Sequence, residues 1–304
     1  MEKKASLGLC IGNFDGVHLG HRQILQALLN WKENKKNAES MLMSFAPHPK
    51  EYFKVPGFQK IYSQCENEAI IHRLGVDSFF WAEFNHSLAA QSKEEFFLFL
   101  KKKFPTLKKI IIGDDFNFAH ARSASAEDLK KMCLEAAIDC EIIQCSTLSA
   151  ETVTKVSSSF IRKLLLSGEV RAANQLLIDP FTISGVVEKG AQLGRKISFP
   201  TANIYFHKNQ PSPLLANGVY ATRSHIRGVL YEGVSNLGMA PTFQRSLRSL
   251  ETHLFQPIAE VYDFPMSVEF IDRIRPERKF ASQAELIEQI QIDVQHSREL
   301  LRRY

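Results

Sequence analysis

The sequence predicts two domains: an α/β domain built on a parallel sheet, followed by an antiparallel β-barrel that ends in a helix. Three observations lead to this fold class. The chain has 304 residues, which is longer than one hydrophobic core usually supports. Up to about residue 178, short apolar runs alternate with amphipathic stretches. Beyond Asp179-Pro180, most runs are strand-like and are broken by Gly, Pro and Asn, so we place the domain boundary between residues 179 and 180.

The first domain, residues 1–179, is expected to alternate strands with helices. The apolar runs that predict its strands are 7–11, 41–45, 78–82, 109–112 and 140–143. Helical spacing of apolar residues occurs in 22–31, 68–74, 94–104, 127–137 and 160–166. Because near-continuous apolar strands that alternate with helices are typical of sheets buried on both faces, we expect a parallel sheet with helices on either side.

The second domain, residues 180–304, is expected to be mostly β. Short runs, several of which alternate polar and apolar residues, predict strands at 182–187, 218–222, 229–234, 250–255 and 266–270. A closed or nearly closed antiparallel barrel is the natural arrangement, because it leaves few open strand edges. The segment 283–301 is amphipathic, with Leu286, Ile290 and Val294 on one face, which predicts a helix packed on the barrel.

Composition narrows the class of protein. Apolar residues make up 44% of the chain and charged residues 23%, which excludes disordered and collagen-like chains. A formal net charge of +5 suits anionic small molecules as well as nucleic acid and decides nothing alone. The five cysteines form no C-x-x-C pair and no zinc spacing, and no secretory or membrane-spanning run follows the first residues. We therefore expect a cytoplasmic protein with reduced thiols and no membrane partner.

A Gly-rich run, residues 12–21, follows the first predicted strand and leads into the first predicted helix. Its glycines allow tight turns and close approach of the backbone, and a helix start supplies unpaired N–H groups with the positive end of the helix dipole. We therefore expect an anion site. His18 and His21 would point the same way and donate hydrogen bonds to phosphate oxygens that gain charge in a transition state. Two surface histidines beside a turn are the alternative.

A Ser-rich segment offers a second anion site in the same domain. Ser157, Ser158 and Ser159 come directly before a predicted helix, and Arg162 lies in its first turn. They would supply capping hydroxyls, free N–H groups and a guanidinium at a helix start. A simple serine cap with a surface arginine is the alternative.

At these residues the chain resembles a known family. The run 11–21 is followed by Phe45-Ala46-Pro47-His48-Pro49, by Gly113-Asp114-Asp115-Phe116-Asn117-Phe118 and by Val156-Ser157-Ser158-Ser159-Phe160-Ile161-Arg162. Together they are similar to the adenylyltransferase module of the bacterial bifunctional riboflavin kinase/FAD synthetases. The resemblance implies a nucleotidyltransferase fold, Rossmann-like with an H-x-G-H motif. It also implies that the FMN phosphate attacks the α-phosphorus of ATP in line and expels pyrophosphate.

The resemblance implies roles for individual residues. His18 and His21 would stabilise the α-phosphate in transit. Ser158, Ser159 and Arg162 would hold the other phosphates. The remaining matched residues would form the nucleotide loop and the flavin side, with Gly12, Asn13, Asp15 and Gly20 around the nucleotide and Pro47, His48, Asp115 and Phe116 around the flavin. A structural proline turn is the alternative for Pro47 and His48.

One loop departs from the family pattern. Relatives tend to have glycines after the Gly-x-Asp-Phe segment where this chain has Ala119, Ala121 and Ala124. Any of these alanines that needs a positive φ angle would cost on the order of 1 kcal/mol. The departure makes adenylyl transfer the less secure of the two activities.

A further set of polar residues lies in the barrel half. A loop with Gly190 and Gly194 is followed by Thr201 and Asn203, which would face the same side of an extended strand. Both would present oxygen atoms to one hard cation, for which a Mg²⁺ ion that carries ATP is the obvious candidate. Strand alternation would place Glu251 on the face opposite its apolar neighbours. A hairpin turn, a strand start and a solvated glutamate are the alternatives.

These barrel residues are similar to the riboflavin kinase module of the same family, a six-stranded barrel with a C-terminal helix. The resemblance implies phosphoryl transfer from MgATP to the ribityl 5′-hydroxyl of riboflavin, with Glu251 as the general base. Thr201 and Asn203 would hold Mg²⁺ and the phosphates, and the loop from Gly190 to Gly194 would close over the nucleotide. The matched residues that would border the flavin are Arg275 and Phe280.

Three functions follow, in descending order of support. The first is a bifunctional enzyme that phosphorylates riboflavin and adenylylates FMN with ATP and Mg²⁺, as a monomer or weak oligomer without a nucleic acid partner. The second is a riboflavin kinase whose first domain transfers adenylyl groups poorly, because of the alanines in its loop. The third is a flavin or nucleotide sensor without catalysis, which ranks low because the chemical groups at both sites are present.

Overall fold

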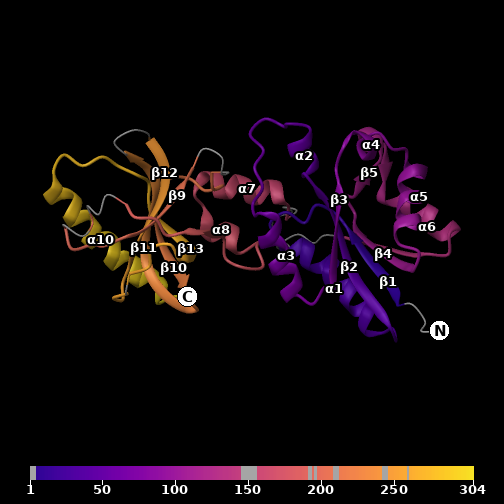
Figure 1. Ribbon diagram of the computed structural model, residues 1–304, viewed down its shortest axis with the longest axis horizontal. Coiled ribbons are helices and arrows are strands. Elements are labelled where there is room, and N and C mark those ends of the chain that lie inside the picture. The colour runs from indigo at the N-terminus through magenta and orange to yellow at the C-terminus, as the bar shows by residue number, and fades with distance from the viewer. Residues whose placement is uncertain are drawn as a thin grey trace, which may run out of the picture. The chain divides into compact units, whose positions relative to one another are not determined.

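The computed structural model describes residues 5–144, 156–190, 194, 197–207, 212–241, 246–258 and 260–304 (Figure 1). Contacts between Cα atoms divide the chain into two compact units, Met1–Ser158 and Ser159–Tyr304. Helix α8 (Val170–Asn174) goes with the second unit, because it packs on strand β13 (Pro265–Arg275). The boundary at 179/180 stays a prediction about where the domains separate.

The first unit is built on a parallel sheet whose strands lie in the order β3-β2-β1-β4-β7. The strands are β1 (Ser6–Ile11), β2 (Ala38–Ala46), β3 (Ser78–Glu83), β4 (Leu107–Gly113) and β7 (Asp139–Ile143). Each coincides with one of the apolar runs, so the predicted parallel α/β sheet is confirmed.

The helices of this unit are α1 (Leu19–Glu33), α2 (Pro49–Tyr52), α3 (Gln64–Arg73), α4 (His86–Ala89), α5 (Lys93–Lys103) and α6 (Ala126–Glu135). Local capping explains where three of them begin. The hydroxyl groups of Ser63, Ser92 and Ser125 each accept the backbone N–H of the residue three positions later. The acidic side chain of that later residue accepts the backbone N–H of the serine. Helices α2 and α4 are single turns and have no apolar periodicity from which to predict them.

The side chains of β1 alternate between two helical layers. Leu9 and Ile11 belong to a core cluster that includes residues of α5 and α6. Gly8 and Cys10 face α1, because a Cβ atom on Gly8 would overlap the Trp31 ring and the Cys10 thiol contacts the Ile24 carbonyl oxygen at 3.7 Å. The sheet is therefore covered on both faces, as predicted.

The strand order reverses at β1, which has β2 on one side and β4 on the other. In open α/β sheets, ligands bind beyond the carboxyl ends of the strands at such a reversal. The Gly-rich run follows β1 at this point of the sheet. The topology therefore supports the location expected for the first site.

The second unit is a six-stranded antiparallel sheet in the order β8-β13-β10-β11-β12-β9. The remaining strands are β8 (Thr182–Val186), β9 (Ala202–Phe206), β10 (Gly218–Ile226), β11 (Val229–Pro241) and β12 (Ser246–Leu254). The sheet nearly closes into a barrel, because the Glu188 N–H group donates to the Asn203 carbonyl oxygen at 2.8 Å. Strand β9 was not among the predicted apolar runs, although Thr201 and Asn203 were expected on an extended strand here.

Helix α10 (Gln283–Leu301) packs on the barrel, along β10, β11 and β13, as predicted (Figure 1). The most deeply buried residues lie on the same face as the predicted apolar ones, towards the C-terminal end of the helix. The fully buried residues are Asp293, Ser297, Leu300 and Leu301, whereas Leu286, Ile290 and Val294 are only half-buried. The polar residues among them can be buried because they are hydrogen-bonded. The Ser297 hydroxyl, for example, donates to the Gly233 carbonyl oxygen at 2.9 Å. Apolar periodicity therefore identified the contact face but could not show that it also buries hydrogen-bonded polar groups.

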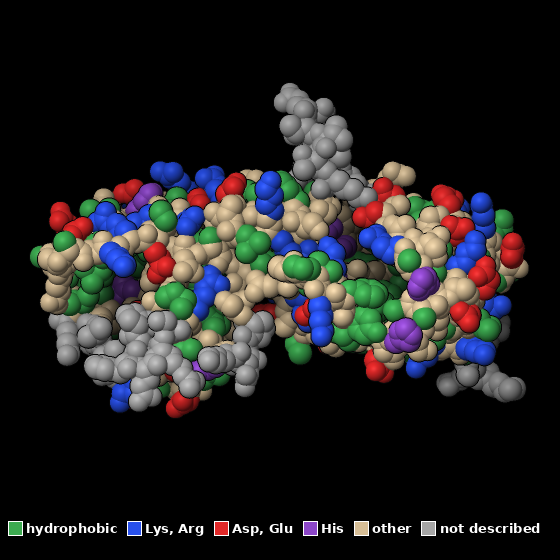
Figure 2. Space-filling model, turned by 90° about the horizontal axis from the view of Figure 1, so that it is seen from above, with side chains coloured by type: hydrophobic (Ala, Val, Ile, Leu, Met, Phe, Trp, Pro, Cys, Tyr) green, Lys and Arg blue, Asp and Glu red, His purple; other side chains and the backbone are tan. Residues whose placement is uncertain are grey.

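The surface carries charges of both signs. On the face that Figure 2 shows, the Lys and Arg side chains of the described residues are interspersed with Asp and Glu. None of the helices in the described part of the chain combines the length and apolar character needed to cross a bilayer.

Candidate active sites

The Gly-rich loop after β1 is held in place by a buried carboxylate. Asp15 is 2% exposed, and its Oδ1 accepts the Ile61 N–H at 2.9 Å. Gly16 has a φ angle of 80°, and its N–H donates to the Asn67 Oδ1 at 3.2 Å. Asp15 therefore shapes this loop by binding backbone of the segment before α3. The pattern of glycines could not reveal that partner, which is distant in the sequence.

His18 and His21 form a reciprocal cap at the start of α1. The Nδ1 of His18 accepts the His21 N–H at 3.3 Å, and the Nδ1 of His21 accepts the His18 N–H at 3.4 Å. A neutral imidazole that accepts through one nitrogen carries its proton on the other. Both rings therefore have the tautomer with a proton on Nε2, which leaves an N–H donor on the side away from the helix backbone.

The two rings are stacked, with 3.7 Å between centroids and 15° between planes. Burial lowers the pKa of His21 well below 6.5, and the neighbouring His18 lowers it further. A neutral ring also avoids the repulsion that two stacked cations would suffer. The site therefore offers neutral N–H donors at the positive end of a helix, an arrangement that can stabilise a developing negative charge.

The Ser-rich element and the Gly-rich loop meet in the structure. The Ser158 hydroxyl, at the start of helix α7 (Ser158–Ser167), donates to the Asp15 carbonyl oxygen at 2.8 Å. Ser159 and Arg162 belong to the second unit, and Arg162 is 9% exposed. Their predicted contacts with ATP phosphates stay predictions.

A small cavity of about 30 Å³ lies at the carboxyl ends of β1 and β2. It brings together residues that were predicted for the nucleotide and for the flavin: Asn13, Asp15, Pro47 and His48 all line it. The sequence reasoning missed other lining residues, among them Lys60, Asn67 and Trp81. No motif marks these three, because they come from three separate segments of the chain.

His48 also has a structural role. Its Nδ1 accepts the Lys50 N–H at 3.0 Å and so caps α2, and its ring stacks on Phe58 at 4.6 Å between centroids. Both the flavin-lining prediction and the structural-turn alternative are thus compatible with its place. Asp115 and Phe116 follow β4. Asp115 is exposed, and Phe116 stacks on Phe118 at 5.6 Å.

The alanine loop adopts the strained conformation that the departure from the family suggested. Ala119 has φ 65° and ψ 176°, and Ala121 has φ 52° and ψ 25°. The first combination is essentially restricted to glycine, and the second is unfavourable for alanine. Ala124 differs, because it lies in the short strand β6 (Ala124–Ser125), which pairs with β5 (Asn117–Phe118), and has no positive φ. Only two of the three substitutions therefore cost backbone energy.

In the barrel, the predicted residues converge on one face of neighbouring strands. Glu251 of β12 lies opposite Asn203 of β9 on one side and Asn236 of β11 on the other. The Thr201 hydroxyl donates to the Asn203 Oδ1 at 3.3 Å. Leu250 is fully buried behind this face, as the predicted alternation requires.

The loop glycines are required by close packing. A Cβ atom on Gly190 would overlap the Asn203 side-chain amide, and one on Gly194 would overlap the Phe199 carbonyl oxygen. The Phe199 N–H in turn donates to the Gly194 carbonyl oxygen at 2.8 Å. Larger residues at these two positions would therefore clash with Asn203 and with the backbone of Phe199. Residues 191–193, which lie between them, are outside the described residues.

Glu251 is half-buried, and burial raises the pKa of its carboxyl group. Hydrogen bonding by Ser249 opposes this rise, and the charge of Glu277 adds to it. The pKa of Tyr205 is raised by burial and by Glu251 and Glu188. Sequence reasoning missed Glu277, because no local pattern connects it with β12.

Two side chains of the barrel could supply oxygen ligands for a cation. Within the described residues, no group of three or more His, Cys, Asp and Glu side chains is arranged to hold a metal ion. Thr201 Oγ1 and Asn203 Oδ1 lie 3.3 Å apart and are hard oxygen donors. A Mg²⁺ ion bound mainly by nucleotide phosphates and water needs only one or two protein oxygens, so this pair fits it.

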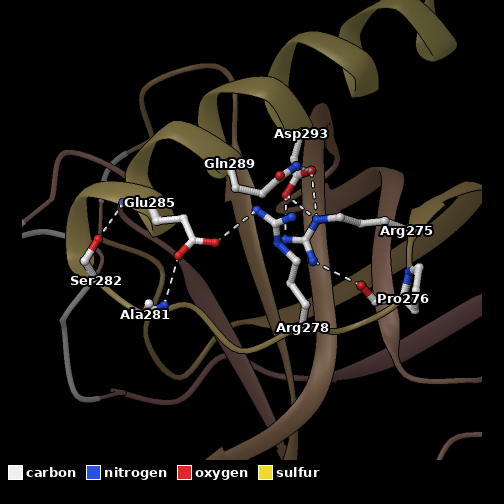
Figure 3. Close-up of polar contacts among 8 residues, drawn as sticks. All are labelled: Arg275, Pro276, Arg278, Ala281, Ser282, Glu285, Gln289 and Asp293. Atoms are coloured by element: carbon white, nitrogen blue, oxygen red, sulfur yellow. Dashed lines mark hydrogen bonds and ion pairs between the residues drawn. The ribbon is translucent and has the colours of Figure 1, made fainter.

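Arg275 ends β13, and Phe280 follows it in the connection to α10. Figure 3 shows Arg275 beside Asp293 of α10. The Nε of Arg275 bonds both carboxylate oxygens of Asp293 at 3.0 Å, and Nη2 bonds one at 2.8 Å. Arg275 also lies over the Phe280 ring at 5.6 Å. The guanidinium thus joins the barrel to its helix. Its predicted place beside the flavin stays a prediction.

Comparison with protein families gives a match for each half of the chain. A FAD synthetase model matches residues 1–160, and a riboflavin kinase model matches residues 177–301. Curated relatives match nearly the whole length. A Buchnera aphidicola protein is 36% identical over 94% of this chain and 91% of its own length. An Escherichia coli protein is 36% identical over 96% and 91%, and a Bacillus subtilis protein is 32% identical over 97% and 93%. All three are named bifunctional riboflavin kinase/FMN adenylyltransferase.

A solved structure shares the fold along nearly the whole chain. It is a Streptococcus pneumoniae protein described as a macrolide-efflux protein, with a TM-score of 0.81 and 28% sequence identity. The likeness covers 96% of this chain and 94% of that one. The efflux description belongs to that protein alone, and the similarity here is one of architecture.

Proposed function

The chain belongs to the family of bifunctional riboflavin kinase/FMN adenylyltransferases, and on this premise we propose how its two units divide the work. The barrel unit transfers the γ-phosphate of ATP to riboflavin and forms FMN. The α/β unit then joins FMN to the adenylyl group of a second ATP and forms FAD, with release of pyrophosphate.

This division is supported by the positions of the two sets of polar residues, because each set lies within a different family match. The His18–His21 pair lies within the FAD synthetase match, and Thr201, Asn203 and Glu251 lie within the riboflavin kinase match. Each centre has groups suited to one kind of transfer. A carboxylate on a strand face can accept a hydroxyl proton, and neutral N–H donors at a helix start can stabilise a phosphate in transit.

In the barrel, Glu251 accepts the proton of the ribityl 5′-hydroxyl as this oxygen attacks the γ-phosphorus. A raised pKa suits this role, because a base whose pKa is nearer to the working pH takes the proton more readily. Asn203 and Thr201 orient the phosphates and hold the cation that accompanies ATP. Bound Mg²⁺ would neutralise charge that develops on the transferred phosphoryl group.

In the α/β unit, no side chain needs to form a covalent intermediate. The FMN phosphate is the nucleophile, and the protein aligns it with the α-phosphorus of ATP. The Nε2–H group of His21 donates to an oxygen of that phosphate, while the cap of α1 fixes the orientation of the ring. Asn13, Pro47 and His48 form the neighbouring walls of the cavity.

One observation favours a second candidate, a riboflavin kinase with weak adenylyltransferase activity. Ala119 holds φ 65° and ψ 176° in the loop that follows Phe116, where glycine would be unstrained. If the loop relaxes away from this conformation, the flavin side of the α/β site is altered while the barrel is untouched.

Product analysis separates the candidates. The purified chain is incubated with riboflavin and MgATP, and the flavins are resolved by chromatography. We expect both FMN and FAD. FMN alone would identify the second candidate, and the absence of both products would contradict the assignment of either activity.

A further inference from the structure

The side chain of Asn67, on α3, reaches both the Gly-rich loop and the cavity at the carboxyl ends of β1 and β2. It is 4% exposed and lines that cavity. Its Oδ1 accepts the Gly16 N–H at 3.2 Å. Because only the oxygen of a side-chain amide can accept such a bond, this contact fixes which way the amide is turned. The NH₂ group of Asn67 therefore points away from the Gly16 N–H.

This NH₂ group is a donor without a partner. Among the described residues, no hydrogen bond is formed by Asn67 Nδ2. In the same part of the chain, the unpartnered side-chain atoms that are sealed from solvent are Gln91 Oε1, Ser224 Oγ and Arg273 Nε. Asn67 Nδ2 is therefore accessible, and the open space beside this nearly buried side chain is the cavity. A donor left open in such a place is suited to a ligand that brings an acceptor.

The walls of the cavity fit the edge of an aromatic ring. Trp81 Nε1 and Gln64 Nε2 both donate to Glu68 Oε1, and the second of these bonds is 3.3 Å long. The first bond fixes the Trp81 ring as one wall. Further apolar walls come from Phe45, Ala46 and Pro47. A neutral donor between apolar and aromatic walls is suited to a carbonyl oxygen on a flat ring.

Charge and size make this cavity less suitable for a phosphate. The Lys60 ammonium, on the cavity wall, is paired with Glu51 at 3.2 Å. The buried carboxylate of Asp15 lies on the wall as well and would repel a phosphate dianion. The volume of about 30 Å³ is close to that of one water molecule. It therefore admits an oxygen atom at the edge of a ring.

We propose that Asn67 is a specificity-determining residue for FMN in the α/β unit. Its NH₂ group donates to a carbonyl oxygen at the pyrimidine edge of the isoalloxazine ring, while its Oδ1 holds the turn at Gly16. The proposal rests on the proposed conversion of FMN to FAD by this unit. One amide thereby ties the flavin ring to the loop that serves the nucleotide. Such alignment is what the reaction requires of the protein, because no covalent intermediate is formed.

The test is the kinetics of FAD formation from FMN and MgATP by Asn67→Asp in the full chain. Aspartate has the same shape and keeps an oxygen for the Gly16 N–H, but it offers the flavin no donor. The KM for FMN should rise roughly tenfold, because a buried acceptor loses its donor. The KM for ATP should change far less, and FMN formation from riboflavin should be unchanged.

Asn85→Asp is the matched control. Asn85 Oδ1 accepts the Leu88 N–H at 3.0 Å and so caps α4, and Asn85 does not line the cavity. The same substitution there keeps the accepting oxygen and should leave both KM values unchanged. A rise in the KM for FMN that is equal in the two variants would show that the added charge, and not the lost donor, is responsible, and would overturn the proposal.

Lumiflavin distinguishes the ring from the phosphate as the bound group. It has the isoalloxazine ring without the ribityl chain, so it competes with FMN but cannot be phosphorylated. Its inhibition constant should rise in Asn67→Asp by the same factor as the KM for FMN. If the KM for FMN rises and lumiflavin inhibits both chains equally, the donor does not bind the ring and the proposal is wrong.

The wild-type chain gives a check that depends on no variant. With 2-thio-FMN or 4-thio-FMN, one of the two KM values should exceed that for FMN, because sulfur is a weaker acceptor than oxygen. Equal KM values for all three flavins, or an unchanged KM for FMN in Asn67→Asp, would refute the role of Asn67 and leave the proposed reaction standing. If the wild-type chain forms no FAD from FMN, the proposed adenylyltransferase activity itself is wrong.

Discussion

The imidazole rings of His18 and His21 stack at 3.7 Å, and the Nδ1 of each accepts the backbone N–H of the other residue. One local device thus starts a helix, sets the tautomer of both rings and directs their Nε2–H groups away from the backbone. A phosphate at this helix start would meet neutral donors that are already oriented. This relationship leads to the first prediction.

Protonation of His21 should cause no loss of FAD formation from supplied FMN as the pH falls through 6.5, the ordinary pKa of histidine. Burial and His18 lower the pKa of His21, so the ring stays neutral in the folded protein at this pH. In the unfolded chain the same ring would take up a proton. The contribution of His21 to stability should therefore decrease as the pH falls below 6.5. Adenylyl transfer and urea unfolding at several pH values measure both effects, and an acid limb at 6.5 that His21→Gln removes would contradict the account.

Ala119→Gly should stabilise the α/β unit by about 1 kcal/mol or more, because glycine adopts the observed φ and ψ without strain. Ala121→Gly should act in the same direction. Ala124→Gly is the matched control, since Ala124 is 1% exposed and has no positive φ, and it should destabilise the unit. Midpoints of urea unfolding followed by tryptophan fluorescence give the three values. Equal effects at all three positions would show that the loop is not strained.

Gly190→Ala should impair FMN formation, because the added methyl group would overlap the Asn203 side-chain amide. We expect a rise in the KM for ATP and a fall in kcat, while FAD formation from supplied FMN is unchanged. Gly228→Ala is the control, because it introduces alanine at φ 78° in the same barrel with open space around it. It should cost about 1 kcal/mol of stability and leave both reactions intact. Loss of kinase activity in the control alone would contradict the steric explanation.

Asp293→Ala should destabilise the barrel unit by about 3–5 kcal/mol, because it leaves the Arg275 guanidinium in a part-buried place without its carboxylate. The double variant with Arg275→Ala should lose less than the sum of the two single variants, since the unpaired charge is then gone. Thermal unfolding of the four chains gives the coupling. Additive losses would indicate that the pair in Figure 3 contributes no coupling energy.

Regular elements of this protein were largely predictable from its sequence. Apolar runs located the strands of the parallel sheet, and the period of 283–301 gave the bounds of α10. The short helices α2 and α4 were not predictable in this way, because each is a single turn and shows no period. The buried polar residues of α10 were not predictable for another reason. One of them is Asp293, whose partner Arg275 lies on β13.

The residues of the candidate sites were predictable where they lie in a local motif. His18, His21, Thr201 and Asn203 have that property, and the structure places each pair within one cluster. Lys60 and Trp81, which line the cavity, were not predictable, because each comes from a separate segment and belongs to no local motif. Glu277 is similar. The position of its carboxylate over β11 depends on the lack of a side chain at Gly238.

The most direct test of the account is a comparison of products from three chains: wild type, Glu251→Ala and His21→Ala. Each is given riboflavin with MgATP in one reaction and FMN with MgATP in another. We predict that Glu251→Ala forms no FMN from riboflavin but still converts FMN to FAD, and that His21→Ala forms FMN but little or no FAD. Loss of both reactions in either variant, with the fold intact by circular dichroism, would contradict the division of the two activities between separate sites.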